Sequence, residues 1–444
     1  MAEKCTSNSS IYVVMVPLPA QGHLNQLLHL SRLVSSYNIP VHYVGTTAHI
    51  QQAKIRAHGF DPLTITNIHF HEFQTPPFET ALPNPNASNK FPNHLMPSFY
   101  ATFHLHEPVC ALVRELLSKN HKKVVCYSFN STSTFMTNSF LWEFKGKPLL
   151  PGTELYEDIP SILDCFPTEF WEFLTIQEQF DGKISCGELY NSSRVIESLY
   201  LDLMAKEYDG LNQWAIGPFN PLEPNATSKD SNKRHDSLHW LDKQEQNSVI
   251  FVSFGTTTSL SNEEVKEVAI GLEKSEQKFI WVLRDADKGD VFTSEVRKVQ
   301  LPKGYEERIK ERGIIVRDWA PQLEILAHSS TVGFMSHCGW KSCMENMSMG
   351  VPIAAWPMHS DQPRNSQLVT NYLKIGLIVR PWTRQDELVT SEMIENAVKT
   401  LMDSTDGDEM RKRAADLSNA IKKSVKNDGI NRAEMDSFIA HISH

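Results

Sequence analysis

The sequence lacks the features that mark membrane-spanning, secreted and nucleic-acid-binding proteins. It has no run of about 18 apolar residues, the length that a membrane-spanning helix needs. Its first ten residues are polar and lack the apolar stretch of a secretory signal. The net charge of -10 offers no basic surface to nucleic acid or to an anionic membrane. We therefore expect a cytoplasmic protein that binds neither nucleic acids nor membranes.

The sequence also gives little indication of disulfide bonds or of a metal site. The seven cysteines are scattered and form no Cys-x-x-Cys pair, so they predict neither a disulfide framework nor a zinc site. One short acidic motif, Asp285-Ala-Asp287, has the D-x-D pattern that binds a metal–diphosphate in some transferases. It follows a strand and lies in a charged loop of a kind that is commonly just solvated. We predict no metal site.

The chain does contain two successive blocks of alternating strands and helices. The first opens with a β-branched run at residues 11–17, a glycine turn, and an apolar-faced helix that starts at His23. The second has strand-like runs at residues 249–255, 279–283, 313–317, 332–336 and 351–356. Between the blocks, residues 219–236 are rich in Pro, Asn, Ser, Lys and Asp, which predicts a linker.

This order predicts an α/β fold with two Rossmann-like doubly wound domains, residues 1–218 and 237–444, that face each other across a cleft. Ligands bind at the carboxyl ends of the strands in such folds. The sequence ends in an amphipathic helical segment from about Thr390, interrupted near residues 403–408. We expect its last helix to pack back on the first domain.

Residues 319–362 contain the strongest ligand signal. A strand ends before His337, and a helix is expected from Trp340 to residue 349, closed by Gly350 with Pro352 beyond it. A helix N-terminus that faces a cleft offers free N–H groups and a positive dipole end, which suit a diphosphate. In this interpretation Gly339 lets the backbone approach the phosphate, and His337 and Ser342 donate to its oxygens.

The same residues resemble the signature box of plant family 1 UDP-glycosyltransferases. The match extends over 44 positions and has the right internal spacing; it comprises Trp319-Ala-Pro-Gln322, His328, His337-Cys-Gly-Trp340, Ser342, Glu345, Gly350-Val-Pro352, Trp356-Pro357 and Asp361-Gln362. Outside the box, Pro19-Ala-Gln-Gly-His-Leu24 and Val252-Ser-Phe-Gly-Thr256 are also similar to that family. The resemblance implies the GT-B fold, a UDP-glucose donor used without a metal or other cofactor, a small-molecule acceptor and a monomer.

The resemblance also implies roles for the matching positions. Trp319 stacks on uracil, Ala320 and Gln322 lie by the base and ribose, and Glu345 accepts from the ribose hydroxyls. The diphosphate contacts are His337, Ser342 and Thr256, and the sugar contacts are Trp340, Asp361 and Gln362. A terminal glutamine in this box usually accompanies glucose rather than galactose.

Some of these residues also have simpler interpretations. Ser342 and Glu345 are spaced as a helix capping box. Asp361 and Gln362 are also compatible with a solvated loop. At position 341 the family normally has asparagine, whereas this chain has Lys341. The lysine either strengthens phosphate attraction at the expense of a directional hydrogen bond or points to solvent.

His23 is the candidate catalytic base. Transfer of a sugar to an alcohol needs a group that removes the acceptor proton. His23 follows a glycine turn at the end of the first strand and starts a helix, whose positive end keeps the imidazole neutral. A lone histidine at a helix start is more often a surface residue, but Gly-His at this place in the related family marks its base.

The carboxylate partner of this histidine is missing. The family pairs it with an Asp about one hundred residues later, yet this chain has no Asp between Asp61 and Asp158. The strand-like run Val124-Val-Cys126 continues directly into residues that resemble the family's next strand. We infer an internal deletion after Cys126, about one helix and one strand long, which removes the Asp and forces the sheet to reconnect.

The sequence thus predicts an inverting glucosyltransferase that acts on a small lipophilic acceptor. The stretches 348–353, 357–365 and 435–443 are similar to zeatin O-glucosyltransferases, so a zeatin-type cytokinin is one candidate acceptor. The alternative is a homologue that binds a UDP-sugar but transfers it poorly, because the orienting Asp is absent. A glycosidase would need two carboxylates that flank the scissile bond, and no such pair is found in the turns expected to line the cleft.

Overall fold

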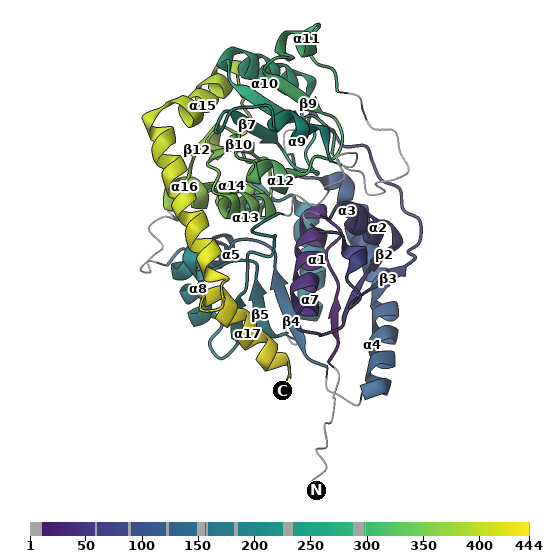
Figure 1. Ribbon diagram of the computed structural model, residues 1–444. Helices are drawn as coiled ribbons and strands as arrows, with labels where there is room; N and C mark the ends of the chain where they lie inside the picture. The colour runs from purple at the N-terminus through teal and green to yellow at the C-terminus, as the bar shows by residue number, and fades with distance from the viewer. Residues whose placement is uncertain are drawn as a thin grey trace.

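The computed structural model shows two α/β halves, one above the other in Figure 1. It describes residues 11–57, 60–87, 90–120, 124–148, 156, 159–181, 185–224, 234–286, 297 and 299–443. The predicted linker therefore falls partly outside the described residues. The C-terminal half is the upper one, and the last helices, coloured yellow, descend from it along the lower half.

The C-terminal half is built on a parallel six-stranded sheet of order β12-β11-β10-β7-β8-β9. Its strands are β7 (Val249–Ser253), β8 (Lys278–Val282), β9 (Gly313–Val316), β10 (Thr331–Ser336), β11 (Ile353–Ala355) and β12 (Gly376–Ile378). The five strands predicted from hydrophobic runs are confirmed, apart from their ends. Strand β12 was not predicted because three residues are too short for a periodic pattern.

Helices cover both faces of this sheet. Val249 and Phe251 of β7 belong to one apolar cluster, whereas Ile250 and Val252 belong to the other. Successive side chains of a strand point to opposite faces, so both faces are buried, as in a doubly wound fold. The helices of this half are α9 (Asp236–Leu241), α10 (Asn262–Ser275), α11 (Tyr305–Ile309), α12 (Gln322–Ala327), α13 (Trp340–Met349), α14 (Gln362–Gln367), α15 (Ser391–Asp403) and α16 (Thr405–Ser424).

The N-terminal half contains two separate three-stranded parallel sheets, of order β1-β2-β3 and β4-β5-β6. The strands are β1 (Val13–Met15), β2 (Val41–Thr46), β3 (Ile68–Phe73), β4 (Cys126–Asn130), β5 (Ser185–Tyr190) and β6 (Asn212–Ala215). The helices are α1 (Gln21–Ser35), α2 (Thr47–Ile55), α3 (Met96–Ala101), α4 (His106–Asn120), α5 (Thr134–Phe144), α6 (Ile162–Cys165), α7 (Thr168–Asp181) and α8 (Arg194–Glu207).

The division into two sheets corrects one expectation. We expected the sheet to reconnect across the inferred deletion, but among the described strands β1 pairs only with β2, and β4 pairs only with β5. Reconnection would require β1 and β4 to approach to about 4.8 Å. The helices packed on both faces of these strands hold the two sheets apart, as described below.

The last helix, α17 (Ile430–Ser443), packs against β6 of the N-terminal half. Phe438 contacts Trp214 with ring centroids 5.3 Å apart, and Met435 belongs to the same apolar cluster. Tyr37 Oη donates to Asp436 Oδ1 at 2.7 Å. The first and last described elements, β1 and α17, therefore lie in the same half, and α17 helps to join the two halves.

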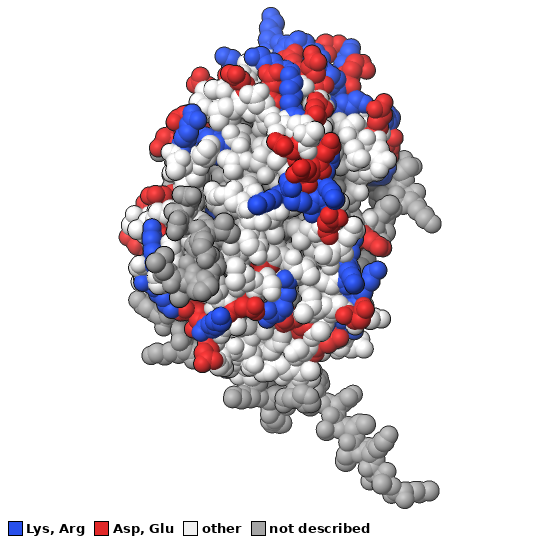
Figure 2. All heavy atoms as spheres, turned by 90° about the vertical axis from the view of Figure 1, so that its left-hand side faces the viewer, with Lys and Arg blue, Asp and Glu red and all other residues white. Residues whose placement is uncertain are grey.

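Charged side chains of both signs are interspersed on the face shown in Figure 2, with uncharged surface between them. In the described part of the chain, no helix combines the length and apolar character that crossing a bilayer requires.

Candidate functional site

A cavity of about 510 Å³ lies between the two halves. It is of the size usual for small-molecule sites. Residues of α1, β4 and the loops before α3 and α7 line it from one side, and the carboxyl ends of β7, β8 and β10 line it from the other. It brings together all but one of the residues predicted from the sequence: His23, Thr256, Trp319, Ala320, Gln322, His337, Gly339, Trp340, Lys341, Ser342, Asp361 and Gln362. The exception is Glu345, which is fully buried below the cavity wall.

The N-terminus of α13 opens at this cavity. Gly339 precedes the helix as its N-cap residue, and no side chain caps it. Ser342 therefore lies inside the helix, so the capping-box interpretation of Ser342 and Glu345 is wrong. Lys341 and Ser342 both line the cavity. The first turn of α13 thus offers the site its N–H groups and the positive end of its dipole.

Two glycines make room for the His337 imidazole. A Cβ at Gly255, where φ is +77°, would come within 2.6 Å of His337 Nε2, and one at Gly339 within 2.7 Å. Gly339 was predicted for its approach to a phosphate, and the structure adds this contact with the ring. Burial first, with a smaller contribution from the charge of nearby Lys341, lowers the pKa of His337 to about 4, so the imidazole is neutral at physiological pH.

Lys341 neither points to solvent nor lies free beside the helix N-terminus. Its Nζ contacts Glu345 Oε1 at 2.5 Å, one helical turn further on. Gln322 Nε2 donates to the other oxygen, Glu345 Oε2, at 2.6 Å, and also to Ser342 Oγ at 3.0 Å. Both oxygens of the buried Glu345 carboxylate are therefore engaged by neighbouring side chains. Neither of the two options considered for Lys341 anticipated this ion pair.

Trp319 meets a residue from the other half of the molecule. The Arg56 guanidinium, just after α2, lies 5.2 Å from the Trp319 ring centroid, within the range of a cation–π contact. Arg56 had no motif around it, so this contact could not be read from the sequence. Ala320 is buried beside Trp319, and its carbonyl accepts from the Gln322 N–H at 2.8 Å.

Trp340 connects the halves through its side chain. Its indole is almost fully buried, and Nε1 donates to the backbone oxygen of Asn191 at 2.8 Å. The Gln362 side chain forms hydrogen bonds within its own loop. Its Oε1 accepts from the backbone N–H groups of Met358 and His359 at 2.9 and 3.1 Å. Its Nε2 lies 3.2 Å from His359 Nε2. Gln362 thus shapes the loop that lines the cavity.

Asp361 has an environment unlike that of a solvated loop residue. Desolvation raises the pKa of its carboxyl group to about 6, although Asn365 Nδ2 donates to Oδ2 at 2.6 Å. Asn365 also donates to the carbonyl of Cys338, which precedes α13. Asp361 is therefore held next to the first turn of α13.

His23 lies at the junction of the two N-terminal sheets. It is in the first turn of α1, and desolvation alone lowers its pKa to about 4. The ring is neutral, as expected, and burial is a cause of its neutrality. Its Nδ1 lies 2.7 Å from the hydroxyl of Ser131, the first residue after β4. The predicted absence of a carboxylate partner thus leaves a serine hydroxyl there, which the sequence reasoning missed.

The part of the cavity beside His23 is apolar and aromatic. Its lining there comprises Leu18, Phe91, Leu95, Phe99, Met136, Phe140, Phe166, Phe170, Trp171 and Leu174. Several of these rings contact one another, for example Phe91 and Phe170 with centroids 5.2 Å apart. The wall comes from α3, α5, α7 and adjoining loops, which are too far apart in sequence to form a motif. It suits a flat lipophilic molecule.

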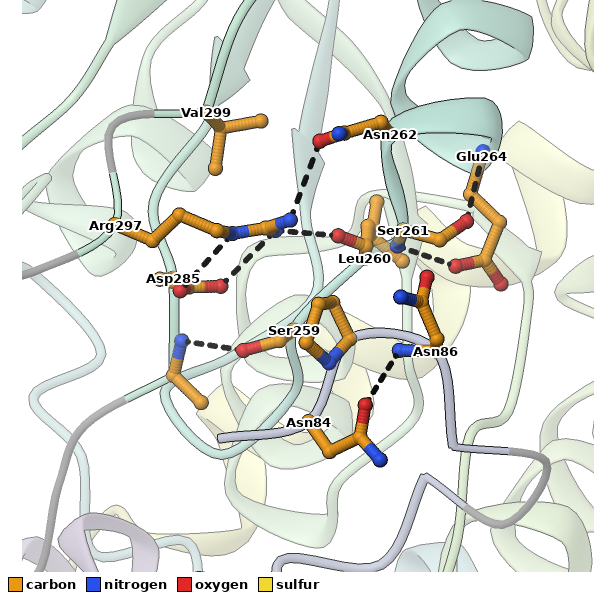
Figure 3. A network of polar contacts seen from close by, with 12 residues as sticks. Asn84, Asn86, Ser259, Leu260, Ser261, Asn262, Glu264, Asp285, Arg297 and Val299 are labelled. Atoms are coloured by element: carbon orange, nitrogen blue, oxygen red, sulfur yellow. Dashed lines mark hydrogen bonds and ion pairs between the residues drawn. The ribbon is translucent and has the colours of Figure 1, made fainter. Parts of the chain in front are cut away.

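The acidic motif at residues 285–287 is structural where it is described (Figure 3). Asp285 forms a two-point ion pair with Arg297, with both contacts at 3.2 Å. Arg297 also donates to the Leu260 carbonyl and to Asn262. Asp287 lies outside the described residues. Within the described ranges, no group of three or more His, Cys, Asp or Glu side chains is arranged to hold a metal ion.

The fold is that of known UDP-sugar-dependent transferases of the GT-B class. UGT71G1 of Medicago truncatula, solved with UDP-glucose, superposes with a TM-score of 0.75 over 99% of both chains at 22% identity. Phytolacca americana UGT2, solved with UDP-2fluoro-glucose and pterostilbene, gives 0.75 over 98% of this chain and 100% of that one at 23% identity. The predicted pair of Rossmann-like domains is thereby confirmed as a fold class.

Sequence comparison identifies the family. Residues 225–424 match the profile of UDP-glucoronosyl and UDP-glucosyl transferase, and residues 9–127 and 125–221 match that of the glycosyltransferase N-terminal domain. Zeatin O-glucosyltransferase of Phaseolus lunatus is 51% identical over 98% of this chain and 97% of its own. Zeatin O-xylosyltransferase of Phaseolus vulgaris is 50% identical over 98% of each. This chain belongs to the family 1 UDP-glycosyltransferases, which transfer a sugar from a UDP-sugar to a small acceptor.

The comparisons do not favour the alternative of a binding protein with impaired transfer. They also bear on the inferred deletion. The N-terminal profile matches in two segments that meet at residues 125–127, with no chain residue left unmatched between them. The two matched segments thus meet at the place of the inferred deletion. The alignment with the Phaseolus lunatus protein extends over 457 positions, more than the 444 residues of this chain.

Proposed function

We propose that this enzyme transfers glucose from UDP-glucose to a hydroxyl group of a small lipophilic acceptor of the zeatin type, with inversion. The observation that supports this most is the shared cavity, in which His23 and an aromatic wall lie opposite the N-terminus of α13 and Asp361. The names of the relatives at 51% and 50% identity support the acceptor class. Those names differ in the sugar, and we favour glucose because the box ends in Gln362.

In this proposal His23 is the catalytic base. Its low pKa keeps the ring neutral, with one proton on its two nitrogens. With that proton on Nδ1, beside Ser131, Nε2 is free to accept the acceptor proton. His23 takes the acceptor proton as the acceptor oxygen attacks the anomeric carbon from the opposite side. The bond to UDP breaks, and the diphosphate carries the released negative charge. The apolar side chains of the aromatic wall exclude water, which would otherwise compete as an acceptor.

The cavity residues predicted from the sequence support the following proposed donor contacts. Uracil would stack on Trp319 in exchange for Arg56, with Ala320 and Gln322 beside it. The ribose hydroxyls would donate to Glu345 in place of Lys341 or Gln322. The diphosphate would accept from the first turn of α13 at Gly339, Lys341 and Ser342, and from His337 and Thr256. Asp361, the backbone of Trp340 and the Gln362 loop would contact the sugar.

The two halves would then divide the work, with residues 1–218 holding the acceptor and residues 237–444 holding the UDP-sugar. We further propose a monomer that acts in the cytoplasm without a metal. No disulfide occurs among the described cysteines, which suits a reducing compartment. The helix dipole and the donors around α13 supply the leaving-group stabilisation that a metal gives elsewhere.

The direct test is incubation with UDP-glucose, and separately with UDP-xylose, and a panel of zeatins and flavonols, read by mass spectrometry. We expect a single hexose to be added to the zeatin side-chain hydroxyl. Preferential pentose addition would overturn the choice of glucose, and transfer to flavonols alone would overturn the acceptor class. Full loss of activity in EDTA with recovery on adding Mn²⁺ would contradict the absence of a metal.

The ion pair between Lys341 and Glu345 predicts an effect on donor affinity. Replacing Lys341 by asparagine, the residue usual in the family, should free Glu345 Oε1 to accept from a ribose hydroxyl. We expect UDP-glucose to bind roughly three- to tenfold more tightly, about the net contribution of one ordinary hydrogen bond. Isothermal titration calorimetry would measure the dissociation constant.

The matched control for this substitution is Lys341→Met, which removes the charge but offers no hydrogen bond in return. If Lys341 instead attracts the diphosphate, both variants would bind UDP-glucose more weakly than the native protein. Glu345→Gln would remove the shared partner, and in that background we expect Lys341→Asn to leave the affinity for UDP-glucose unchanged.

The raised pKa of Asp361 predicts that sugar recognition depends on pH. Because the folded-state pKa is about 6, the carboxylate is charged above that pH and becomes protonated as the pH falls through it. At pH 5 about one molecule in ten keeps the charge, so UDP-glucose should bind about tenfold more weakly than at pH 7.5. Asp361→Asn, whose side chain does not titrate, should show little change between the two pH values. Persistence of the pH effect in Asp361→Asn would contradict this role.

A further inference from the structure

The two N-terminal sheets leave two unpaired strand edges that face each other. Among the described strands, β1 has a partner only in β2, and β4 has one only in β5. Between these edges lies a groove of about 1000 Å³, separate from the cavity with the aromatic wall except that Leu18 and His23 line both. We call it the strand slot. Its walls include residues 11–16 of the β1 segment and residues 124–127 and 129 of the β4 segment.

Apolar side chains line the strand slot both above and below the plane of the two sheets. Tyr12 and Val14 of the β1 segment pack toward α4, whereas Val13 and Met15 pack toward α1 and α17. Side chains from α4 line one face, namely Val109, Val113, Leu116 and Leu117. Side chains from α1 and α17 line the other, namely Leu27, Leu30, Phe438 and Ile442. An occupant would therefore need apolar side chains on both faces, as a buried parallel strand has.

The two edges run in the same direction. Strand β1 leads through a short turn to His23 in α1, and β4 leads directly to Ser131. His23 Nδ1 and Ser131 Oγ are 2.7 Å apart, so the carboxyl ends of both strands lie at the same end of the slot. A strand between them, parallel to both, would complete one continuous parallel sheet. Backbone N–H and C=O groups at such edges are ready to pair with an added chain.

The size of the slot fits one strand. With strands 4.8 Å apart, layers about 10 Å apart and a rise of 3.3 Å per residue, a buried strand occupies about 160 Å³ per residue. The slot is lined by residues 11–16 along the β1 edge, a length that suits a strand of roughly six residues. It is open to solvent at its edge, where Val16, Val124 and Val125 are 46%, 47% and 43% exposed. Exposed apolar side chains of this kind commonly mark a binding surface.

The match to the N-terminal profile breaks at the same point. The N-terminal profile breaks at residues 125–127, at the start of β4, and the related chain aligns over more positions than this chain has. The slot is therefore the space that an absent segment of chain leaves when the flanking strands and helices keep their positions.

We propose that the strand slot binds an extended peptide in trans, a segment of about six consecutive apolar, mainly β-branched residues that pairs in parallel with both β1 and β4. Its backbone supplies two ladders of hydrogen bonds, and its side chains enter the two apolar layers. The binding is non-covalent and does not depend on the transferase activity. Because the slot ends at His23, a bound strand also closes the sheet beneath that residue.

The test uses a fluorescein-labelled peptide of six alternating Val and Ile residues, with two lysines at each end for solubility. We expect saturable binding by fluorescence anisotropy. A peptide with proline at the third and fourth apolar positions, which lacks two N–H donors, should bind at least tenfold more weakly. Hydrogen exchange should slow at the amides of residues 13–15 and 126–130 when the first peptide is added.

Two tryptophan variants provide a matched pair on α4. Val113→Trp fills the slot and should weaken peptide binding at least tenfold, whereas Arg114→Trp, on the exposed side of the same helix, should not change it. A thermal shift with UDP verifies that each variant is folded. This readout is independent of the peptide, so failure of the slot proposal is distinguishable from failure of the donor site.

Several results would overturn the proposal. Equal affinity for the proline peptide would exclude backbone pairing, and absence of binding or of slowed exchange in folded native protein would exclude the occupant altogether. A dimer that Val113→Trp dissociates, without peptide binding, would assign the slot to a second copy of this chain. A lipophilic small molecule that native mass spectrometry detects, and that the peptide does not displace, would assign it to that molecule.

Discussion

Replacing His23 by alanine should lower kcat by 10²- to 10⁴-fold and leave the dissociation constant of UDP-glucose unchanged. A positioned general base contributes a factor of this size, and His23 faces the cavity opposite the donor residues. The low pKa of about 4 adds a pH signature. Because the ring loses its proton above that value, kcat of the native enzyme should not fall from protonation of His23 between pH 5 and 8.

The measurement is kcat and KM with UDP-glucose and a zeatin acceptor, together with calorimetric binding of UDP-glucose. Added imidazole should restore part of the activity of His23→Ala, because it can enter the space left by the side chain. An activity loss that appears in KM alone, with kcat retained, would exclude His23 as the base.

Replacing Ser131 by aspartate should raise kcat ten- to hundredfold. A serine hydroxyl can donate to His23 Nδ1 or accept from it, so it leaves both neutral tautomers accessible. A carboxylate only accepts, which places the ring proton on Nδ1 and the lone pair on Nε2, and it also stabilises the imidazolium that forms. Exchange of such a carboxylate for a neutral amide in a serine protease costs about 10⁴ in turnover, which sets the upper limit.

The pH profile separates this effect from a structural one. A carboxylate beside His23 stabilises the charged ring and raises its pKa, so the acid limb of kcat in Ser131→Asp should move upward from about pH 4. Ser131→Ala should lower kcat about fivefold, the value of one net hydrogen bond. If the native enzyme, Ser131→Asp and Ser131→Ala have the same kcat and the same thermal stability, Ser131 does not position His23.

Hydrophobic periodicity predicted most of the C-terminal half correctly. The runs at residues 249–253 and 331–336 are fully buried strands, and burial on both faces leaves an uninterrupted apolar signal in the sequence. The helix from Trp340 to Met349 with Gly350 in the left-handed conformation was also predicted, since its end signal is local. Strand β12, with only three residues, has no such signal.

The candidate site was predictable where its residues share one segment. The box from Trp319 to Gln362 is one contiguous segment that includes α13 and its flanking loops. The spacing of its residues in the sequence therefore determines how they are arranged around the site. The partners that come from elsewhere were not predictable: Ser131 beside His23, Arg56 over Trp319, and Asn191 against the Trp340 indole. The two members of each pair lie far apart in the sequence and meet only when the chain folds.

The sequence by itself determined the two-domain α/β fold, the transferase family and the residues around α13, because these depend on local periodicity and on a contiguous motif. Only the tertiary structure decided how the first domain accommodates the inferred deletion. Its helices are anchored in apolar layers on both faces of β1 and β4, and these layers hold the strands in place although no described strand lies between them. Closing the slot would break that packing, so two sheets remain, and a serine takes the position beside His23.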